Sequence, residues 1–487
     1  MRRLLGVAIA ATGCAAATGC SAATATVPGS GGWSNAQAVP GVSIQAETEV
    51  YTAPDYVGAS CSSPQDCTVA YAKSGTGGAG QVFSVTRHNG TWAAPRPVPG
   101  LRAEQGPGLA LACRPAADCV LAATVPAGHG GHTVMVARLA HGAWSTARPV
   151  PGLAALHPGD WSQLSALACG RTGWCALSGQ SEKPGSFGRG GRPFVVSEHH
   201  GTWGRAQAVP GLAALTGSWA AGVAVISCDT GDSCTAAGDY RDHAVRSDEP
   251  YVVTDRAGRW GRARPLAGTE SLGASYLSAL SCSQPGDCSA AGTEGDDDTG
   301  TPVGMFTVTE AGGTWHRASR LGGTIKLPYP VDTANITALT CTAPGQCTAL
   351  GTYATNANSE DSVPVDGPLF EAVQVRGTWS AIHAVRGLPS DVVTWTTSVS
   401  CARAGNCAAG GYWLTNPSGD EHSISSYHAF VATETRGTWS AERVPGLAAL
   451  GSTGSAVQAV TCQPRRGCGA VGDYDMHGHR LFTTSRS

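Results

Sequence analysis

The chain has 487 residues, of which 14% are charged and 66 are glycine, and its formal net charge is −3. This composition suits many short strands joined by tight turns, and the absence of long amphipathic stretches argues against a helical solenoid. The charge gives no support for a nucleic-acid or anionic-membrane partner, because such partners select a basic stripe.

Residues 1–28 are typical of an export signal followed by a short tether. A positive start precedes the apolar run Leu4–Gly19, which is too short to span a bilayer. The small residues before Cys20 resemble the lipobox of bacterial lipoproteins, although Ala17 stands where leucine is usual. A lipid anchor on Cys20 is therefore one prediction, and ordinary cleavage at an alanine a few residues later is the alternative. No later segment is apolar enough to cross a membrane.

The rest of the chain, residues 29–487, repeats one unit and is expected to form a single domain. Sixteen cysteines form eight Cys-x5-Cys pairs whose first members are 52 to 61 residues apart. The pairs are Cys61/Cys67, Cys113/Cys119, Cys169/Cys175, Cys228/Cys234, Cys282/Cys288, Cys341/Cys347, Cys401/Cys407 and Cys462/Cys468. An even count at constant spacing in an exported chain indicates disulfides. Zinc is the alternative, but no histidine recurs at a fixed offset to complete a tetrahedral site.

A Gly-x-Trp follows seven of the pairs, and a further copy stands alone ahead of the first pair. The tryptophans are Trp33, Trp92, Trp144, Trp203, Trp260, Trp315, Trp379 and Trp439. Each unit predicts four strands. Strand one ends at the first cysteine, strand two begins at the second, strand three alternates in polarity, and strand four begins at the Gly-x-Trp. The cysteines then face one another across the one–two hairpin, within disulfide range.

Four-stranded antiparallel units repeated eight times predict an all-β fold, an eight-bladed β-propeller. The two ends of the repeat support closure of the ring. Residues Gly31–Gly41 form a fourth strand with no strands before it, and Leu481–Ser485 form a third strand with no Gly-x-Trp after it. The N-terminal strand is therefore predicted to complete the last blade, whereas an open solenoid would show capping units.

The units resemble those of exported actinobacterial repeat proteins with the pattern Ser-Cys-x5-Cys-x-Ala-Val-Gly followed by a Gly-x-x-Trp. The matching stretches are Ser281–Gly292, Thr340–Gly351 and Thr461–Gly472. This resemblance covers nearly all of the exported chain and implies a BNR-like propeller, but such proteins mostly carry no assigned function. Thr254–Trp260 is more weakly similar to the Asp-box of sialidases. It lacks one residue between Gly and Trp, and the other copies lack the Asp.

The repeat also predicts two different faces. The disulfide hairpins and the Gly-x-Trp turns share one uniform face, and the two–three loops and blade connectors share the other. A tryptophan that recurs once per blade is expected to pack between blades rather than to bind a ligand. Function is therefore expected on the variable loops of the opposite face.

Aromatic residues near the central mouth of the variable face are the candidates for ligand binding. They are Tyr56, Trp161, Trp219, Tyr276, Trp395 and Trp413. Such rings stack on sugars or grip peptides, and the alternative is that they only cover blade junctions. Calcium binding is one interpretation of the run Asp296–Asp298. The run lacks the spaced ligands of a calcium loop, so a solvated turn is the favoured interpretation. No cofactor or metal is predicted.

The leading hypothesis is a monomeric, non-catalytic scaffold that is secreted or attached to the outer surface. It would bind a glycan or a protein at the cell envelope. The chain contains no nucleophile elbow, His-Glu-x-x-His or phosphate loop. The alternative is a glycoside hydrolase or lyase of sialidase-like type with carboxylates around the mouth. Arg241 and Arg246 lie on the appropriate face for it, whereas most other arginines, such as Arg148, Arg262 and Arg264, fall in strand four or its turns.

Overall fold

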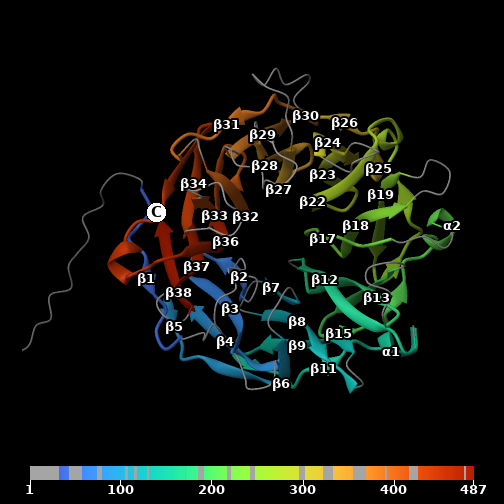
Figure 1. The fold of residues 1–487 in the computed structure, drawn as a ribbon, viewed down its shortest axis with the longest axis horizontal. Helices are drawn as coiled ribbons and strands as arrows, with labels where there is room; N and C mark the ends of the chain where they lie inside the picture. The colour runs from blue at the N-terminus through green and yellow to red at the C-terminus, as the bar shows by residue number, and fades with distance from the viewer. Residues whose placement is uncertain are drawn as a thin grey trace, which may run out of the picture. The chain divides into compact units, whose positions relative to one another are not determined.

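Residues Trp33–Ser487 form one compact unit in the computed structural model. The structure describes residues 32–42, 57–73, 79–104, 108–114, 118–128, 131–156, 158–170, 172–184, 191–216, 221–241, 247–295, 302–321, 333–354, 369–389, 392–415, 426–475 and 479–487. The unit is an eight-bladed propeller of antiparallel blades, as predicted (Figure 1).

From the centre outward, the first four blades contain the following strands. Blade 1 has β2 (Val57–Ser63), β3 (Asp66–Lys73), β4 (Ala79–His88), β5 (Thr91–Trp92) and β6 (Arg96–Glu104). Blade 2 has β7 (Leu109–Arg114), β8 (Asp118–Pro126), β9 (His132–Ala140), β10 (Ala143–Trp144) and β11 (Arg148–Pro149). Blade 3 has β12 (Trp161–Cys169), β13 (Trp174–Glu182), β14 (Arg192–His199), β15 (Thr202–Trp203) and β16 (Gln207–Ala208). Blade 4 has β17 (Val225–Cys228), β18 (Ser233–Arg241), β19 (Asp248–Arg256), β20 (Arg259–Trp260) and β21 (Arg264–Pro265).

The other four blades follow the same plan. Blade 5 has β22 (Ala274–Gln284), β23 (Asp287–Gly295), β24 (Pro302–Ala311), β25 (Thr314–Trp315) and β26 (Ser319–Arg320). Blade 6 has β27 (Thr333–Ala343), β28 (Gln346–Ala354), β29 (Leu369–Val375), β30 (Thr378–Trp379) and β31 (His383–Ala384). Blade 7 has β32 (Val393–Arg403), β33 (Asn406–Thr415), β34 (Ser426–Thr435) and β35 (Thr438–Arg443). Blade 8 has β36 (Ser455–Gln463), β37 (Gly467–Asp475), β38 (His479–Arg486) and β1 (Gln37–Ala38).

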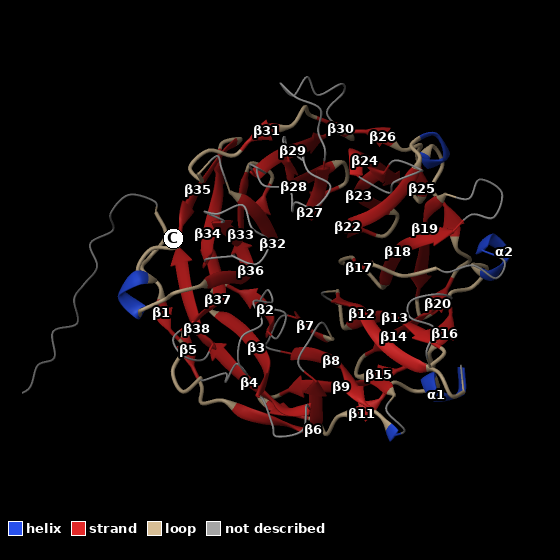
Figure 2. Cartoon of the chain, viewed as in Figure 1, coloured by secondary structure: helices blue, strands red, loops and turns tan. Residues whose placement is uncertain are grey.

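Within the described residues, helical structure is limited to short single turns. They include α1 (Leu153–Leu156), α2 (Ala213–Thr216) and the 3-10 turns η3 (Thr269–Ser271) and η4 (Ala448–Leu450). Figure 2 shows that α1 and α2 lie on the outer rim, while strands make up the blades. The core is therefore built almost entirely from sheet faces that pack blade against blade.

The outermost strand is split into two segments in blades 1 to 6. In several blades, the residue three positions after the tryptophan turns its N–H to the preceding blade. Ala206 N donates to Pro151 O, and Ala263 N donates to Pro210 O, both at 2.7 Å. The Val-Pro-Gly segments thus hold the next blade's outer edge, which is a role that the sequence pattern did not reveal.

The N-terminal strand closes the ring, as predicted. In β1, Gln37 and Ala38 pair with Thr483 and Phe482 of β38. Ala36 N also donates to Pro445 O of blade 7 at 2.7 Å. The strand therefore contacts two blades from the far end of the chain.

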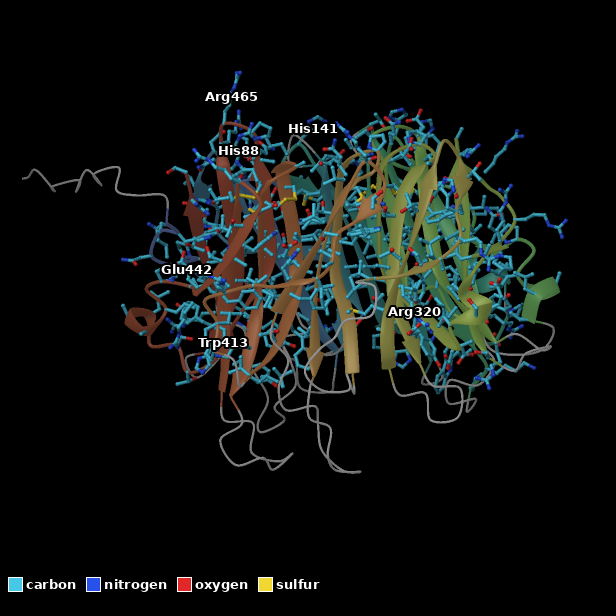
Figure 3. The ribbon with its side chains drawn as sticks, turned by 90° about the horizontal axis from the view of Figure 1, so that it is seen from above. His88, His141, Arg320, Trp413, Glu442 and Arg465 are labelled. Carbon is cyan, nitrogen blue, oxygen red and sulfur yellow. A yellow bond between two sulfur atoms is a disulfide. The ribbon has the colours of Figure 1, made fainter. Side chains whose placement is uncertain are left out.

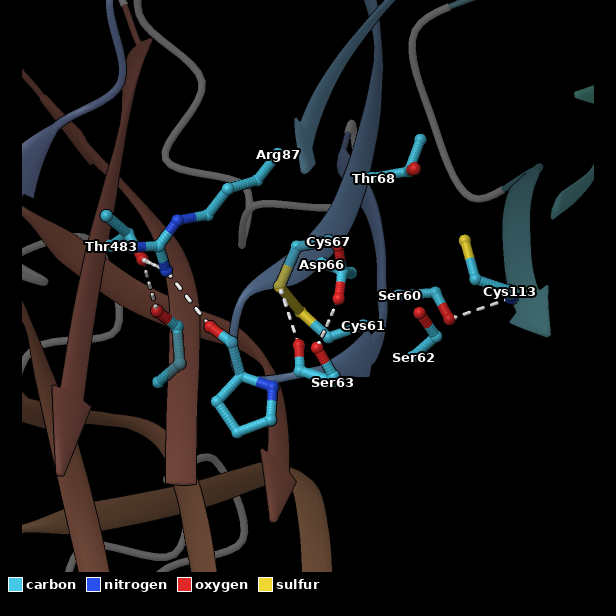
Figure 4. The surroundings of a disulfide bond; sticks show 12 residues. Ser60, Cys61, Ser62, Ser63, Asp66, Cys67, Thr68, Arg87, Cys113 and Thr483 are labelled. Carbon is cyan, nitrogen blue, oxygen red and sulfur yellow. Dashed lines mark hydrogen bonds between the residues drawn. A yellow bond between two sulfur atoms is a disulfide. The ribbon is translucent and has the colours of Figure 1, made fainter. Parts of the chain in front are cut away.

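Eight disulfides span the one–two hairpins, and each joins the two cysteines of a predicted pair. The residue before the first cysteine links neighbouring blades. The hydroxyl of Ser60 accepts a hydrogen bond from Cys113 N at 2.9 Å (Figure 4), and Ser281 accepts one from Cys341 N at 2.9 Å. The serine of the Ser-Cys motif thus links the innermost strands of neighbouring blades, which form no backbone ladder with each other.

The Gly-x-Trp tryptophans pack between blades, as expected. Trp33 lies with Val431 of blade 7 in one cluster, and Trp260 of blade 4 lies with Val195 of blade 3 in another. Each of the eight core clusters spans one blade junction and includes or contacts one of these tryptophans. The repeated tryptophan is therefore a packing residue of the junction.

The glycine that ends the Cys-x-Ala-Val-Gly pattern is required by close contacts. A Cβ on Gly472 would lie 2.1 Å from Ala456 O and 2.5 Å from the Phe482 ring. Gly351 meets Asn335 O and the Phe370 ring in the same way. Here strand one bulges toward strand two, and the aromatic ring of strand three covers the bare backbone.

Replacing Gly472 with alanine is expected to destabilise the protein by roughly 3 kcal/mol or more, because backbone blocks the added methyl group. Gly454→Ala in the same blade is the matched control, since no atom lies within 4 Å of the Cβ it would add. Thermal unfolding of the two variants measures the difference. Equal midpoints would show that the bulge adapts and that the glycine is dispensable.

The two predicted faces are distinct in the side view (Figure 3). His88 and His141 of the three–four turns and Arg465 of a disulfide hairpin lie at one face, and Trp413 lies toward the other. We call these the disulfide face and the loop face.

Candidate functional site

The loop-side ends of the innermost strands carry the candidate site. Tyr276 in β22, Asn335 in β27 and Trp395 in β32 each lie six residues before the first cysteine of their blade. In register they oppose Thr293, Thr352 and Tyr412 of the second strand, so their positions are equivalent in the consecutive blades 5, 6 and 7. Gln163 of β12 is the equivalent residue in blade 3. We call these four residues the mouth residues.

Trp395 is the most distinctive mouth residue. Its side chain is 39% exposed, and among the described residues only Val375 is a comparably exposed large hydrophobic group. The indole stacks on Tyr412 with centroids 6.0 Å apart and planes 11° from parallel. Tyr412 in turn contacts Tyr427 edge to face at 5.5 Å. These contacts hold the indole while part of its surface remains open to solvent.

Tyr276 belongs to a polar group at the junction of blades 4 and 5. Its hydroxyl donates to Asp248 Oδ2 at 2.8 Å, and Arg241 Nη1 donates to the same oxygen at 3.2 Å. Burial, together with the bond to Asp248, raises the pKa of Tyr276 to about 12. The phenol is therefore neutral at physiological pH and acts as a hydrogen-bond donor.

Asp239 lies next to this group and joins the same two blades. Its Oδ1 accepts a hydrogen bond from Leu277 N of β22 at 2.9 Å. In blade 2 the equivalent residue is Thr124, whose hydroxyl accepts from Leu164 N at 3.0 Å. Burial, with a smaller effect of the Asp248 charge, raises the pKa of Asp239 to about 7. Asp239 in blade 4 therefore accepts the same inter-blade hydrogen bond that the Thr124 hydroxyl accepts in blade 2.

The other predicted site residues have different surroundings. Trp161 begins β12, is partly buried and contacts His132 edge to face at 5.9 Å. Trp413 is only 6% exposed and lies in the core cluster between blades 6 and 7. Trp161 and Trp395 lie within innermost strands rather than in the connectors before them, because the ladder begins earlier than the pattern indicated. Tyr56, Trp219 and Asp296–Asp298 lie outside the described residues.

Sequence reasoning missed a series of residues opposite the tryptophans. These are Glu198, Asp255, Glu310, Gln374 and Glu434, each paired in register with the Trp of its own blade. Glu198 accepts a hydrogen bond from Gly201 N, and Gln374 donates to Gly377 O at 3.2 Å. The side chains of Glu198 and Gln374 therefore stabilise the three–four turns of their blades. The sequence signal for this series is a polar residue five positions before the Trp of each blade. It is hard to recognise because the residue type differs from blade to blade.

Two members of the series differ in how their charge is balanced. Glu198 is 1% exposed and pairs with Arg114 at 3.2 Å and Arg138 at 3.4 Å. Burial raises its pKa, and the two arginines oppose that effect. Glu310 is also buried but forms no ion pair within the described chain, and its Oε2 has no hydrogen-bond partner there.

The described ranges contain neither a metal-binding cluster nor a membrane-spanning helix. No cluster of three or more His, Cys, Asp or Glu side chains arranged to hold a metal ion occurs there. Within those ranges no helix has both the length and the apolar character needed to span a bilayer.

Known proteins offer only a likeness of architecture. No family model and no curated protein matches the chain. Among solved structures it is similar to an ulvan lyase of polysaccharide lyase family 25, with 9% identity, a TM-score of 0.43, and 93% of this chain and 94% of that chain covered. It is also similar to a Hadza microbial sialidase, Hz136, with 10% identity and a TM-score of 0.38, and the match covers 75% of this chain and 73% of that chain. YCF48 from Cyanidioschyzon merolae has 11% identity and a TM-score of 0.40, and the match covers 77% of this chain and 96% of that chain. At such low identity the activities of these proteins do not transfer to this chain.

Proposed function

We propose that this propeller is an exported, non-catalytic binding protein that takes a glycan at the mouth residues of its loop face. The observation that carries the proposal is Trp395, an indole held by Tyr412 and 39% exposed at the end of an innermost strand. A rigid aromatic face with open surface stacks on the apolar side of a sugar ring at little entropic cost.

Polar groups at equivalent positions support a sugar as the ligand. Asn335 and Gln163 are exposed amides, each with donors and an acceptor. Tyr276 adds a phenol fixed by Asp248. A stacking ring in blade 7, with hydrogen-bonding groups at the equivalent positions of blades 3, 5 and 6, matches the mixed apolar and polar surface of a glycan. Binding sites of this composition hold ligands by a few well-placed contacts.

The carboxylates near the mouth already take part in structural hydrogen bonds, which favours a binding function over a catalytic one. Asp239 is bonded to Leu277 N, and one oxygen of Asp248 serves both Tyr276 and Arg241. A hydrolase needs a pair of carboxyl groups free to protonate and attack the glycosidic bond. Here both groups brace blades 4 and 5 instead.

The disulfides indicate an oxidising compartment, because cytosolic thiols are kept reduced. Together with the export signal predicted for residues 1–28, they support a place at the cell envelope. Anchoring through Cys20 belongs to this proposal, and a mass spectrum of the exported protein distinguishes a lipidated from a free N-terminus.

A glycan array probed with the exported protein tests the proposal. The wild type is expected to bind a defined set of glycans, and Trp395→Ala is expected to weaken that binding by roughly tenfold or more, since the stacked ring is lost. Val375→Ala is the matched control, because it removes the other exposed large hydrophobic group. It should bind as the wild type does.

Three outcomes would count against the proposal. Binding unchanged in Trp395→Ala would exclude the mouth as the site. No binding to any glycan would leave a protein partner as the remaining ligand class. Turnover of a bound glycan that disappears in Asp239→Asn would establish the hydrolase or lyase alternative.

A further inference from the structure

A second candidate surface lies on the outer rim, away from the mouth residues. A groove of about 280 Å³ between blades 4 and 5 is lined by Arg256, Arg259, Arg262 and Arg264. All four arginines are exposed, and none forms an ion pair within the described part of the chain. The only carboxyl group among the lining residues is Glu310. In a chain of net charge −3, this is a local concentration of positive charge.

Burial raises the pKa of Glu310, and the charges of Arg256 and Arg264 oppose that effect without a direct ion pair. At the equivalent position in blade 3, Glu198 forms direct ion pairs with Arg114 and Arg138. The side chain of Arg114 is only 3% exposed. At Glu310 no such pair forms, and the guanidinium groups remain at the surface. The stem of Arg262 packs over Gly211 of the preceding blade, where a Cβ would lie 3.2 Å from Nε. This contact holds the stem of Arg262 against the preceding blade.

The next junction repeats the groove. Between blades 5 and 6 a wider one, of about 730 Å³, is lined by residues that include Arg317, Arg320 and Arg376. Arg317 and Arg320 are paired there with Glu270 and Glu294. The unpaired charge is therefore greatest between blades 4 and 5 and continues at lower density into the neighbouring groove.

We propose that the groove between blades 4 and 5 binds a polyanionic polysaccharide that bears carboxylate or sulfate groups. Guanidinium groups bind these anions through paired hydrogen bonds. The groove has room for about one sugar ring, so a thin chain fits it better than a folded acidic protein does. The repeat of the groove one blade later suits a ligand with regularly spaced charges. This surface is separate from the mouth, so the two proposals stand or fall independently.

Binding of the exported protein to dextran sulfate and to polygalacturonate tests the assignment, with neutral dextran as the reference polymer. At low salt both charged polymers should bind and neutral dextran should not, and added salt should weaken binding. The double variant R256Q/R259Q should lose about tenfold in affinity, because two charge-assisted contacts are removed. R465Q/R466Q removes the same charge from an exposed disulfide hairpin and should bind as the wild type does.

Polysaccharide binding that is unchanged in R256Q/R259Q, or equally reduced in R465Q/R466Q, would overturn the site. Neutral dextran bound as tightly as the charged polymers would overturn the polyanion assignment. Single-stranded DNA bound as tightly as dextran sulfate would overturn the choice of polysaccharide. Comparing the two charged polymers shows whether carboxylate or sulfate is preferred. Trp395→Ala should leave this binding intact, which separates failure here from failure at the mouth.

Discussion

Trp33→Ala is expected to lower the free energy of unfolding by about 3–5 kcal/mol, the range for removing a buried aromatic side chain. Trp33 is 7% exposed and packs among residues of blades 7 and 8, and its indole N–H donates to the Thr433 hydroxyl at 3.0 Å. It also anchors the only strand by which blade 8 is completed. Its loss should therefore weaken the closure of the ring as well as one cluster.

Gln37→Ala is the matched control for this prediction. Gln37 lies in β1, is exposed, and keeps its backbone pairing with Thr483 when its side chain is shortened. Unfolding midpoints and hydrogen exchange in β38 should separate the variants, with lost protection in Trp33→Ala only. Equal stability of both variants would mean that the N-terminal strand contributes little to closure.

Stability is expected to fall as the pH rises from about 5 to 8, and Glu434 should account for roughly 2–3 kcal/mol of the fall. Glu434 is 2% exposed, and its Oε2 has no hydrogen-bond partner in the described chain. Burial, and secondarily the charge of Glu371, raises its pKa to about 7 from a usual value of 4.5. The folded state thus holds a proton that the unfolded state has released.

The sign follows from that difference in bound protons. Below the unfolded pKa both states are protonated, and the carboxyl group costs nothing extra. As the pH rises through the folded pKa of about 7, the folded state must ionise a buried group, and the stability is lost. The same direction is expected for Asp239, whose pKa is also raised to about 7.

Glu434→Gln should remove its share of the pH dependence and make the protein more stable than the wild type at pH 8. Glu442→Gln changes an exposed carboxylate of the next strand and is the control. Urea unfolding at several pH values between about 5 and 8 measures the effect. A stability profile for Glu434→Gln that runs parallel to that of the wild type would contradict the assignment.

The candidate site was only partly predictable. Trp395 and Tyr276 were predictable as candidates because they are aromatic residues outside the repeated pattern. The structure places both at equivalent ends of innermost strands. The sequence could not distinguish Trp395 from Trp413, although the two are 39% and 6% exposed. Their exposure depends on which face of blade 7 each occupies and on what the neighbouring blade presents there.

The sequence by itself determined the blade count, the eight disulfides and the closure by Trp33–Gly41. These features depend on contacts within one unit, or on two fragments that each lack what the other supplies. The tertiary structure decided the roles of Ser281, Pro210, Glu198 and Arg262. Each acts through a partner in another strand or blade, at a separation that no local pattern encodes. The same holds for the arginine groove, because guanidinium groups become a site only when a neighbouring blade leaves them unpaired.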